Sequence, residues 1–582
     1  MRGSPAAETR PAKILNRDGE RPITLSLNTI GIKARAAALA RALRLPRWRL
    51  GINGLLVMVA LYLALGQNAA FWHQVRSTLP AALGLREYFL LGSLFVTLSV
   101  LLVLALLVLS ARAIVKPALT IFLLTASVCG YFMTAFGVVI DDQMIVNLLQ
   151  TNAAEAGELV SGPLILHVLL GGILPAALVW RVQLACGSRF QELLRRLSLA
   201  AVALTVLLVC VLGNYKTLSL WFRGHHEVRM YTNPTYPINA LIGQLKTAYK
   251  TADEPLQQIA TDATRRPLAS GKPRVVVLVV GETARAANFQ LAGYGRATNP
   301  KLSAIDGLVS FSQLWSCGTA TAVSVPCMFS RLGRSAFTDA KARTEENLLD
   351  VLQRTGVSVL WRDNNSNCKA VCARVPSEDF RRLKIDGLCN ADGCYDEVVL
   401  HGLDELIASG TADRFIVLHL LGSHGPSYYK RYPPAFRRFV PDCAQDDVQS
   451  CSRAAIVNAY DNTILYTDHV LAQLVELLKR HQDQVDPVML YMSDHGESLG
   501  ENGLYLHGLP YAIAPDEQKH VPFLLWSPAT DRGCVESRRD GAYSHDNLFH
   551  TVLGLFAVST REYDDHADIL RGCSPSADGA ST

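Results

Sequence analysis

The run Y-F-L-L-G-S-L-F-V-T-L-S-V-L-L-V-L-A-L-L-V-L-S, from Tyr88 to Ser110, contains no charged residue. A helix of about 20 apolar residues crosses the roughly 30 Å hydrocarbon core of a bilayer. A buried helix of a soluble protein is usually shorter and keeps a polar face. The run therefore predicts a transmembrane helix.

Four further uncharged runs make the same prediction, and all lie before residue 216. The mean hydropathy of the whole chain, +0.18, is too high for an ordinary soluble enzyme and agrees with several spans. We therefore expect a five-helix transmembrane domain over residues 50–215. The four runs are Leu50–Trp72, Pro117–Ile140, Leu159–Trp180 and Leu197–Tyr215.

Charge predicts the orientation of these spans. The first 50 residues carry eleven Lys and Arg against three acidic residues, a net charge of +8 in a chain that sums to +5. Basic residues also flank the second and fourth connections (Arg112 and Lys116, then 181–196), whereas the third connection (141–158) is acidic. The positive-inside rule then places the N-terminus in the cytoplasm and everything after Tyr215 outside it. The basic balance is thus a topology signal, and we expect no nucleic-acid partner.

Residues 1–49 form a basic cytoplasmic extension in this scheme. Residues 1–30 have a composition typical of a disordered tail, and Lys33–Trp48 predicts either a basic helix on the inner membrane surface or a plain solvated tail. No small-residue cleavage site follows the first run, so that run should remain as an anchor.

The cysteines support the same orientation. Ten of the thirteen follow residue 300, an even number in the compartment predicted to be oxidising. Zinc-binding thiolates are the alternative, but no double C-x-x-C with zinc-ribbon spacing is present. Spacing does not decide whether Cys534 and Cys573 also pair. The close pairs are Cys317–Cys327, Cys368–Cys372, Cys389–Cys394 and Cys443–Cys451.

Residues 216–273 predict a membrane-proximal bridge. Trp221, Phe222 and Tyr231 are of the type that favours a membrane–water interface. His225 and His226 also lie here, and we interpret them as an interfacial polar pair rather than as ligands.

Residues 274–582 predict a catalytic domain built on a parallel sheet. Short runs that are apolar on both faces alternate with helical patterns, which is typical of a sheet covered on two sides. Ligand sites in such folds lie at the carboxyl ends of the strands. The strands are predicted at Arg274–Val280, Val357–Trp361, Phe415–Leu421, Val488–Met492 and Val521–Trp526, and the helices at Thr344–Arg354, Glu397–Ala408 and Ile456–Lys479.

Polar motifs follow several of these strands. Glu282 follows the first, His424 lies in G-S-H-G-P, and Asp494 and His495 lie in S-D-H-G-E-S; His507 comes a little later. Two carboxylates, one imidazole and one hydroxyl complete a four-coordinate zinc site. Glu497 could support such a site or form a salt bridge.

The hydroxyl is sought in S-C-G-T-A-T-A-V-S-V-P-C-M-F-S, residues 316–330. The loop holds Thr319 and Thr321 between two cysteines. A threonine hydroxyl is a poor nucleophile unless a metal ion or a base removes its proton. Either threonine is a candidate on this evidence.

This set of motifs, with G-E-T-A-R after the first strand, resembles the lipid A phosphoethanolamine transferases. That family includes the mobile colistin-resistance enzymes. The resemblance covers nearly the whole chain and implies an α/β domain of the alkaline-phosphatase/sulfatase type in the periplasm, anchored in the bacterial inner membrane by five helices. The basic N-terminal extension is the departure from the family pattern.

The resemblance also implies residue roles. Thr321 is the expected nucleophile, and one Zn²⁺ ion is the expected cofactor. The substrate-phosphate pocket would contain Asn365 and Lys369, with His424 and His507; these histidines hold further zinc in some relatives. Without the resemblance, Lys369 could equally be a solvated loop charge, and His424 a hydrogen-bonded residue at a strand end. The implied zinc ligands are Glu282, Thr321, Asp494 and His495.

The implied reaction begins with phosphatidylethanolamine as donor. Its headgroup would be carried on Thr321 and passed to a lipid A phosphate, and the loss of negative surface charge would give resistance to polymyxins and other cationic peptides. We expect a monomer. The acceptor rests on resemblance alone, and the sequence does not say which lipid A phosphate is modified, how many zinc ions bind, or how the domain moves over the bilayer.

Other functions remain open at this point. Core heptose or a periplasmic glucan are alternative acceptors, and a lipoteichoic-acid-synthase-like glycerol-phosphate transferase is an alternative enzyme that the dense cysteines disfavour. A sulfatase is disfavoured because its C-x-P-x-R motif is absent. A membrane sensor or transporter with an inactive domain is the non-enzymatic alternative, and the uncharged spans disfavour ion-coupled transport.

Overall fold

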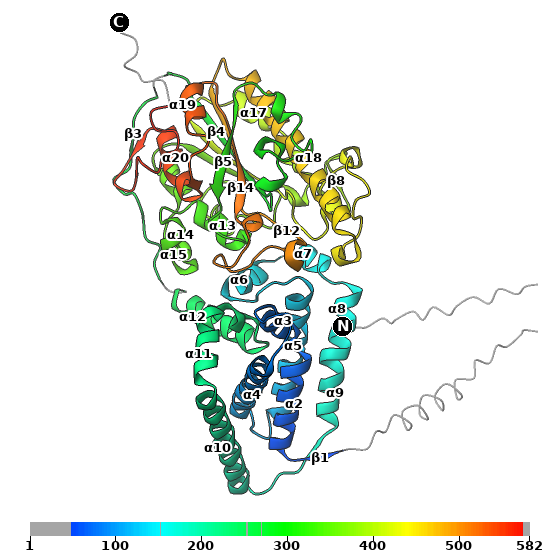
Figure 1. Ribbon diagram of the computed structural model, residues 1–582. Helices are drawn as coiled ribbons and strands as arrows, with labels where there is room; N and C mark the ends of the chain where they lie inside the picture. The colour runs from blue at the N-terminus through cyan, green and yellow to red at the C-terminus, as the bar shows by residue number, and fades with distance from the viewer. Residues whose placement is uncertain (1–47, 152, 252–253, 269, 574–582) are drawn as a thin grey trace, which may run out of the picture.

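The computed structural model describes residues 48–573 except 152, 252–253 and 269. The basic extension before residue 48, including nearly all of the helix predicted at Lys33–Trp48, lies outside the described residues. A bundle of apolar helices forms one end of the molecule, and an α/β domain with the C-terminus forms the other (Figure 1).

Four helices of the described chain are long and apolar enough to cross a membrane, and a bent helix pair brings the number to as many as five. The prediction of five spans is therefore met only if the bent pair counts as one. The four are α4 (Leu85–Val108), α5 (Val115–Ala135), the combined helix Gly162–Arg181 and α10 (Arg189–Gly213).

The bent pair occupies the first predicted span. Helix α2 (Ile52–Gly66) ends within this span, and α3 (Ala69–Ser77) follows it at an angle of 51°. Asn68 lies at the break, where its amide donates to the carbonyl oxygen of Leu63 at 2.8 Å and to that of Asn233 at 2.7 Å. The break thus fastens the bundle to the segment that leads out of it.

The combined helix contains one turn of π-helix, η1 (Leu169–Ile173), between α8 (Gly162–Val168) and α9 (Leu174–Arg181). Pro175 lacks the N–H that would normally bond to the carbonyl oxygen of Gly171. The Tyr62 hydroxyl donates to that oxygen instead, at 2.7 Å. A neighbouring helix thereby satisfies a backbone group that lipid cannot satisfy.

The predicted bridge is mostly helical. It begins with α11 (Tyr215–Gly224) and continues through α12 (Thr235–Thr251). Its last part pairs with the α/β domain, because β3 (Thr264–Arg265) is antiparallel to β16 (Val558–Ser559).

An eight-stranded sheet forms the centre of the α/β domain, in the order β15-β5-β14-β11-β4-β10-β6-β7. Strands β11, β4, β10 and β6 are mutually parallel neighbours, so their carboxyl ends share one edge. The strands are β4 (Arg274–Gly281), β5 (Leu308–Trp315), β6 (Ser358–Asp363), β7 (Ser377–Asp379), β10 (Arg414–His419), β11 (Asp486–Ser493), β14 (His520–Trp526) and β15 (Tyr543–Ser544).

Both faces of this sheet are buried, as the continuous apolar runs predict. Along β4, Val276 and Leu278 belong to one hydrophobic core, and Val275 and Val277 belong to the other. Helices α16 (Leu348–Arg354) and α20 (Asp546–Leu555) cover the first face. The long helix α18 (Arg453–Arg480) covers the second.

The sheet differs from the prediction in two respects. Strand β14 is antiparallel to both of its neighbours. Strands β5, β7 and β15 have no counterpart among the predicted strands. Residues of β5 alternate between buried and partly exposed, so this strand lacks a continuous apolar run. The helix predicted at Glu397–Ala408 is interrupted at Gly402, whose φ of +68° ends one helical segment before α17 (Leu403–Ala408) begins.

Five disulfides form in the α/β domain. The four pairs predicted from spacing are confirmed, and Cys534 pairs with Cys573 across 39 residues. The three remaining cysteines are free and lie in or beside the membrane helices.

Candidate active site

The shared edge of the parallel strands brings together three of the predicted ligands. Glu282 directly follows β4, and Asp494 and His495 directly follow β11. One ligand atom from each lies within 4.8 Å of the others, and all three side chains are fully buried. His495 Nε2 lies 3.4 Å from both a Glu282 and an Asp494 oxygen.

Thr321 completes this group. It is the first residue of α13 (Thr321–Met328), in the loop that follows β5. Its hydroxyl lies 3.0 and 3.1 Å from the two carboxylate oxygens of Glu282 and 3.3 Å from His495 Nε2. Thr319 instead donates to the carbonyl oxygen of Leu509 at 2.6 Å, so of the two candidates only Thr321 reaches the ligands.

The Asp494 carboxylate offers a buried oxygen to a cation. Its Oδ1 accepts the backbone N–H groups of Thr283 and His495, at 3.1 and 2.7 Å. Its Oδ2 is buried and has no hydrogen-bond partner. A buried carboxylate oxygen without a partner is costly, and a bound cation would remove that cost.

Electrostatics agree with this reading. Burial and the charge of Glu282 raise the pKa of Asp494 to about 7. Burial alone would lower the pKa of His495, but Asp494 and Glu282 raise it to about 9. Burial likewise opposes ionisation of Glu282, yet the hydrogen bond and charge of His495 hold its pKa well below the usual range. Two crowded carboxylates thus compete for the positive charge that a divalent cation would supply.

Two neighbouring groups hold Glu282 in place. Asn365, which follows β6, donates its amide to Glu282 Oε2 at 2.6 Å and to the carbonyl oxygen of Leu420 at 2.8 Å. Gly422 packs so closely that a Cβ there would lie 2.6 Å from the Glu282 carbonyl oxygen, and its φ is +55°. Asn365 therefore lies directly against Glu282.

The two predicted pocket histidines also approach this group. The ring centroids of His424 and His507 are 5.8 Å apart, and His507 lies 4.3 Å from His495. The buried Glu497 accepts from His507 Nδ1 at 2.8 Å and from the Tyr428 hydroxyl at 2.5 Å. Because the Nδ1 proton points to Glu497, His507 Nε2 keeps its lone pair. The role of Glu497, which the sequence left undecided, is thus to orient His507.

Lys369 is buried rather than solvated. Its amine donates to the Ser366 hydroxyl at 2.7 Å, beside Asn365, and its φ of +49° lies in the left-handed region. By contrast, His225 and His226 lie beside Glu227 in the bridge, away from the strand ends.

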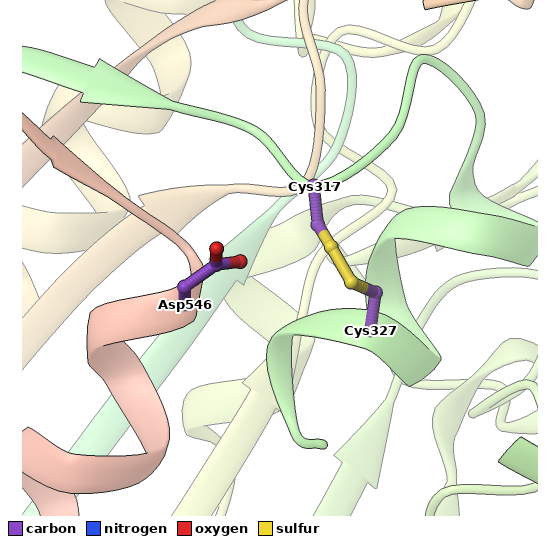
Figure 2. A group of neighbouring side chains, drawn as sticks. All are labelled: Cys317, Cys327 and Asp546. Atoms are coloured by element: carbon purple, nitrogen blue, oxygen red, sulfur yellow. A yellow bond between two sulfur atoms is a disulfide. The ribbon is translucent and has the colours of Figure 1, made fainter. Parts of the chain in front are cut away.

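A second cluster of possible ligand atoms includes both cysteines of the loop that carries Thr321. Figure 2 shows Asp546 turned toward Cys317 and Cys327, and the three ligand atoms lie within 4.8 Å of one another. The two sulfurs are joined in a disulfide, so neither is a thiolate. The cluster fastens the loop and does not form a metal site.

His545 is a residue that the sequence reasoning missed. Its Nδ1 accepts the backbone N–H of Cys317 at 3.1 Å, and its Nε2 donates to the carbonyl oxygen of Ser493 at 2.9 Å. Burial lowers its pKa to about 4, so the ring is neutral and can both accept and donate. It joins the loop that carries Thr321 to β11, the strand that Asp494 follows, and no local motif signals it.

Comparisons with known proteins show the family of the chain. A family model for phosphoethanolamine transferase EptA/EptB matches residues 98–249, and a sulfatase model matches residues 274–558. Phosphoethanolamine transferase EptA of Escherichia coli K12 is 40% identical over 542 residues, which cover 91% of this chain and 98% of the relative. Phosphatidylethanolamine transferase Mcr-1 of Escherichia coli is 39% identical, over 89% of this chain and 97% of the relative.

A solved structure extends the likeness to both halves of the molecule. The integral membrane protein lipooligosaccharide phosphoethanolamine transferase A of Neisseria meningitidis superposes with a TM-score of 0.87 at 37% identity, over 90% of this chain and 99% of that one. With such identity over nearly the full length of its relatives, the chain belongs to the phosphoethanolamine transferase family.

Proposed function

We propose that the chain transfers phosphoethanolamine from phosphatidylethanolamine to a phosphate of lipid A, with Thr321 as the covalent carrier and one zinc ion as cofactor. The observation that carries the proposal is the Thr321 hydroxyl, 3.0 Å from Glu282 and 3.3 Å from His495. Family membership supplies the transferred group, and this geometry supplies the nucleophile.

The donor set fits zinc. Zinc favours four-coordinate sites of nitrogen and oxygen donors, and Glu282, Thr321, Asp494 and His495 offer one imidazole, two carboxylates and a hydroxyl. Asp494 Oδ2, which is buried without a hydrogen bond and lies 3.4 Å from His495 Nε2, supports a cation at this position. When bound there, zinc would act as a Lewis acid that makes the Thr321 hydroxyl easier to deprotonate.

The first half-reaction loads Thr321. Its hydroxyl oxygen attacks the phosphorus of phosphatidylethanolamine, an Oγ1–P bond forms, and the P–O bond to diacylglycerol breaks. The threonine proton passes toward the Glu282 carboxylate, which accepts its hydrogen bond. Diacylglycerol gains one proton as it leaves, so the protons balance. The buried site keeps competing water away from the loaded threonine.

The second half-reaction unloads it. An oxygen of a monoanionic lipid A phosphate attacks the same phosphorus, a P–O–P bond forms and the Oγ1–P bond breaks. Thr321 regains its hydroxyl with the proton that the lipid A phosphate loses. Two half-reactions through one nucleophile predict ping-pong kinetics.

The surrounding polar groups are suited to a phosphate. Lys369 supplies a buried ammonium beside Asn365, and His424 and His507 face each other on the opposite loops. Burial and the charge of His495 lower the pKa of His507, so that ring is neutral at pH 7 and its Nε2 offers a lone pair to the ammonium of the headgroup or to a further cation.

The membrane half suits two lipid substrates. The chain is a multi-pass inner-membrane protein whose catalytic domain lies in the periplasm. We count α2 and α3 as one bent span: fifteen residues of α2 cover about 22 Å, and α3 turns aside at the periplasmic interface. Five crossings place the catalytic domain on the opposite side from the basic N-terminus.

The same scheme gives the division of the chain. Residues 1–49 are the cytoplasmic extension, 50–215 the spans, 216–273 the bridge and 274–582 the catalytic domain, and the enzyme acts as a monomer because one chain supplies every ligand. Transfer of an ethanolamine amine to lipid A lowers the negative surface charge, which weakens the binding of polymyxins.

Mass spectrometry of lipid A tests the function. Cells that express the chain should add phosphoethanolamine to lipid A, and cells that express Thr321→Ala at the same level should not. Unmodified lipid A together with modified core heptose or periplasmic glucan would reassign the acceptor. Modification by Thr321→Ala would contradict the nucleophile.

A further inference from the structure

Two loops of the active site contact the membrane domain directly. The contact segment is the described part of residues 136–158, which joins α5 to α8 and includes α6 (Asp142–Gln150) and α7 (Ala153–Glu158). Figure 1 shows α6 and α7 at the junction of the two halves. The contact segment therefore lies between the membrane helices and the pocket loops.

The loop that carries His507 lies on this segment at two points. The backbone N–H of Tyr505 donates to the carbonyl oxygen of Phe136 at 3.1 Å. On the other side of the histidine, Gly508 packs so closely that a Cβ there would lie 2.6 Å from the Met144 methyl carbon. His507 is therefore held between two contacts with the membrane domain.

The loop that carries His424 is held by an ion pair. Arg431 Nη2 lies 2.5 Å from a carboxylate oxygen of Glu158, and the side chains of the pair are 6% and 15% exposed. The same guanidinium donates through Nε to the carbonyl oxygen of His424 at 2.8 Å. One side chain thus links the membrane domain to the backbone of a pocket histidine.

Three of the four proposed zinc ligands are held by the sheet instead, whereas Thr321 begins α13, which contacts α6 of the contact segment. Glu282, Asp494 and His495 directly follow paired strands of the sheet, whose register fixes their positions within the catalytic domain. His424 and His507 lie on loops, and contacts outside the catalytic domain help to define where those loops lie. Docking of the two halves should consequently affect the two sets of residues differently.

We propose that the Arg431–Glu158 ion pair is a positioning device through which the membrane domain sets His424 beside His507 for the phosphate of the lipid substrate. The proposal rests on the proposed function of the site. Arg431 and Glu158 touch no reacting atom and act through the backbone of His424. The membrane domain would then complete the substrate pocket as well as anchor the enzyme.

The test uses the full-length chain in mixed micelles that contain phosphatidylethanolamine, with diacylglycerol release as the signal. Glu158→Ala should raise KM for phosphatidylethanolamine about tenfold while kcat stays within about twofold, because the pocket loosens and the nucleophile does not move. Arg431→Met should act in the same direction. The double variant should be no worse than the more damaged single one, because the two residues act as a unit.

Two control variants and two further measurements separate positioning from general damage. Glu158→Gln keeps a hydrogen-bond acceptor and should recover part of the loss, and Asp142→Ala removes an exposed acid from the same segment and should leave KM unchanged. Bound zinc should stay at the wild-type level in every variant. Hydrogen exchange in Glu158→Ala should quicken at residues 424–431 and stay unchanged in β4 and β11.

The outcomes are distinguishable. A wild-type chain that releases no diacylglycerol would overturn the proposed function itself. If the wild type is active and Glu158→Ala keeps the wild-type KM and the wild-type hydrogen exchange at residues 424–431, the ion pair has no positioning role. If Glu158→Ala loses zinc, or if hydrogen exchange in β4 quickens as much as at residues 424–431, the ion pair has a structural role instead. If Arg431→Met fails to fold, Glu158→Ala still tests the ion pair, because this substitution lies in the membrane domain.

Discussion

The active site consists of two groups of residues that are held in different ways. The ligand group (Glu282, Thr321, Asp494 and His495) is buried at the edge of a parallel sheet and packed against two hydrophobic cores. The loop group (Lys369, His424 and His507) is held by single hydrogen bonds, disulfides and the membrane domain.

The difference indicates a division of labour. Chemistry on a phosphorus atom needs a nucleophile and a cation fixed within a fraction of an ångström, which a sheet edge provides. Two lipids of different shape must enter in turn, and adjustable loops suit that task. Damage to the ligand group should therefore abolish the chemistry, whereas damage to the loop group should weaken binding.

The largest effect is expected for Thr321→Ala, which tests the ligand group at its centre. Loss of a covalent nucleophile costs about 10⁴-fold or more in kcat. Diacylglycerol release from phosphatidylethanolamine measures it, and thermal unfolding should show an intact fold. Thr319→Val is the matched control. It removes a hydroxyl that only donates to the carbonyl oxygen of Leu509, and it should keep most of the activity. Equal losses in both variants would break the distinction between the two threonines.

The next effect compares the two groups directly through zinc. Asp494→Asn removes a ligand whose Oδ2 is otherwise partnerless, and zinc in the purified chain should fall at least about tenfold. His507→Ala should keep its zinc at the ligand site and raise KM for phosphatidylethanolamine. Elemental analysis after dialysis measures the first, and steady-state kinetics the second. Full zinc in Asp494→Asn would show that the ion does not sit in this group.

A smaller effect is expected behind the ligand group, at the buried pair His419 and Asp363, 3.1 Å apart. Burial alone would lower the pKa of His419, but Asp363 raises it; burial would raise the pKa of Asp363, but His419 lowers it. The histidine contribution is complete below its unfolded pKa of 6.5 and is lost as pH rises through the folded value. The aspartate contribution is complete above 3.8 and is lost as pH falls.

His419→Gln should consequently destabilise the protein most between about pH 4 and 6.5. We expect a loss of about 3 kcal/mol near pH 5 and a smaller one near pH 9, measured as the difference in Tm from wild type at each pH. A loss that grows with pH would mean that the pair is not charged in the folded state. Asp363 also accepts the backbone N–H of Asn365 at 2.9 Å, so the variant should loosen Glu282 as well.

The smallest effect is expected for a disulfide near the loop group. Cys443 and Cys451 close a loop of eight residues after the His424 segment. The chain-entropy account gives about 2.5 kcal/mol for such a loop. Cys443→Ser/Cys451→Ser should lower Tm accordingly and raise KM with no loss of zinc. Unchanged thermal stability of the wild type in dithiothreitol would show that the disulfides do not matter to stability.

Much of the ligand group was predictable because local signals carry it. Each strand before Glu282 and Asp494 is a continuous apolar run, and parallel strands bring their carboxyl ends together. Thr321 needed family resemblance, since spacing alone did not separate it from Thr319. Strand β5 escaped prediction because its residues alternate in burial, and the antiparallel sense of β14 has no local signature.

The contacts that join distant parts of the chain were not predictable. Arg431 and Glu158 are 273 positions apart and belong to different halves of the chain. His545 reaches Cys317 across 228 positions. Nothing in the sequence near either residue marks such a pairing, because it depends on how the completed elements pack. The break at Asn68 is of the same kind, since its partner Asn233 comes from the bridge.

The most direct test of the account is to trap the loaded nucleophile. The purified chain, incubated with phosphatidylethanolamine and no acceptor, should gain one phosphoethanolamine group, and peptide mapping should place it on Thr321. Addition of lipid A should then remove the group and restore the original mass. A group that maps to another residue, or turnover of lipid A without any loaded enzyme, would contradict a mechanism through Thr321.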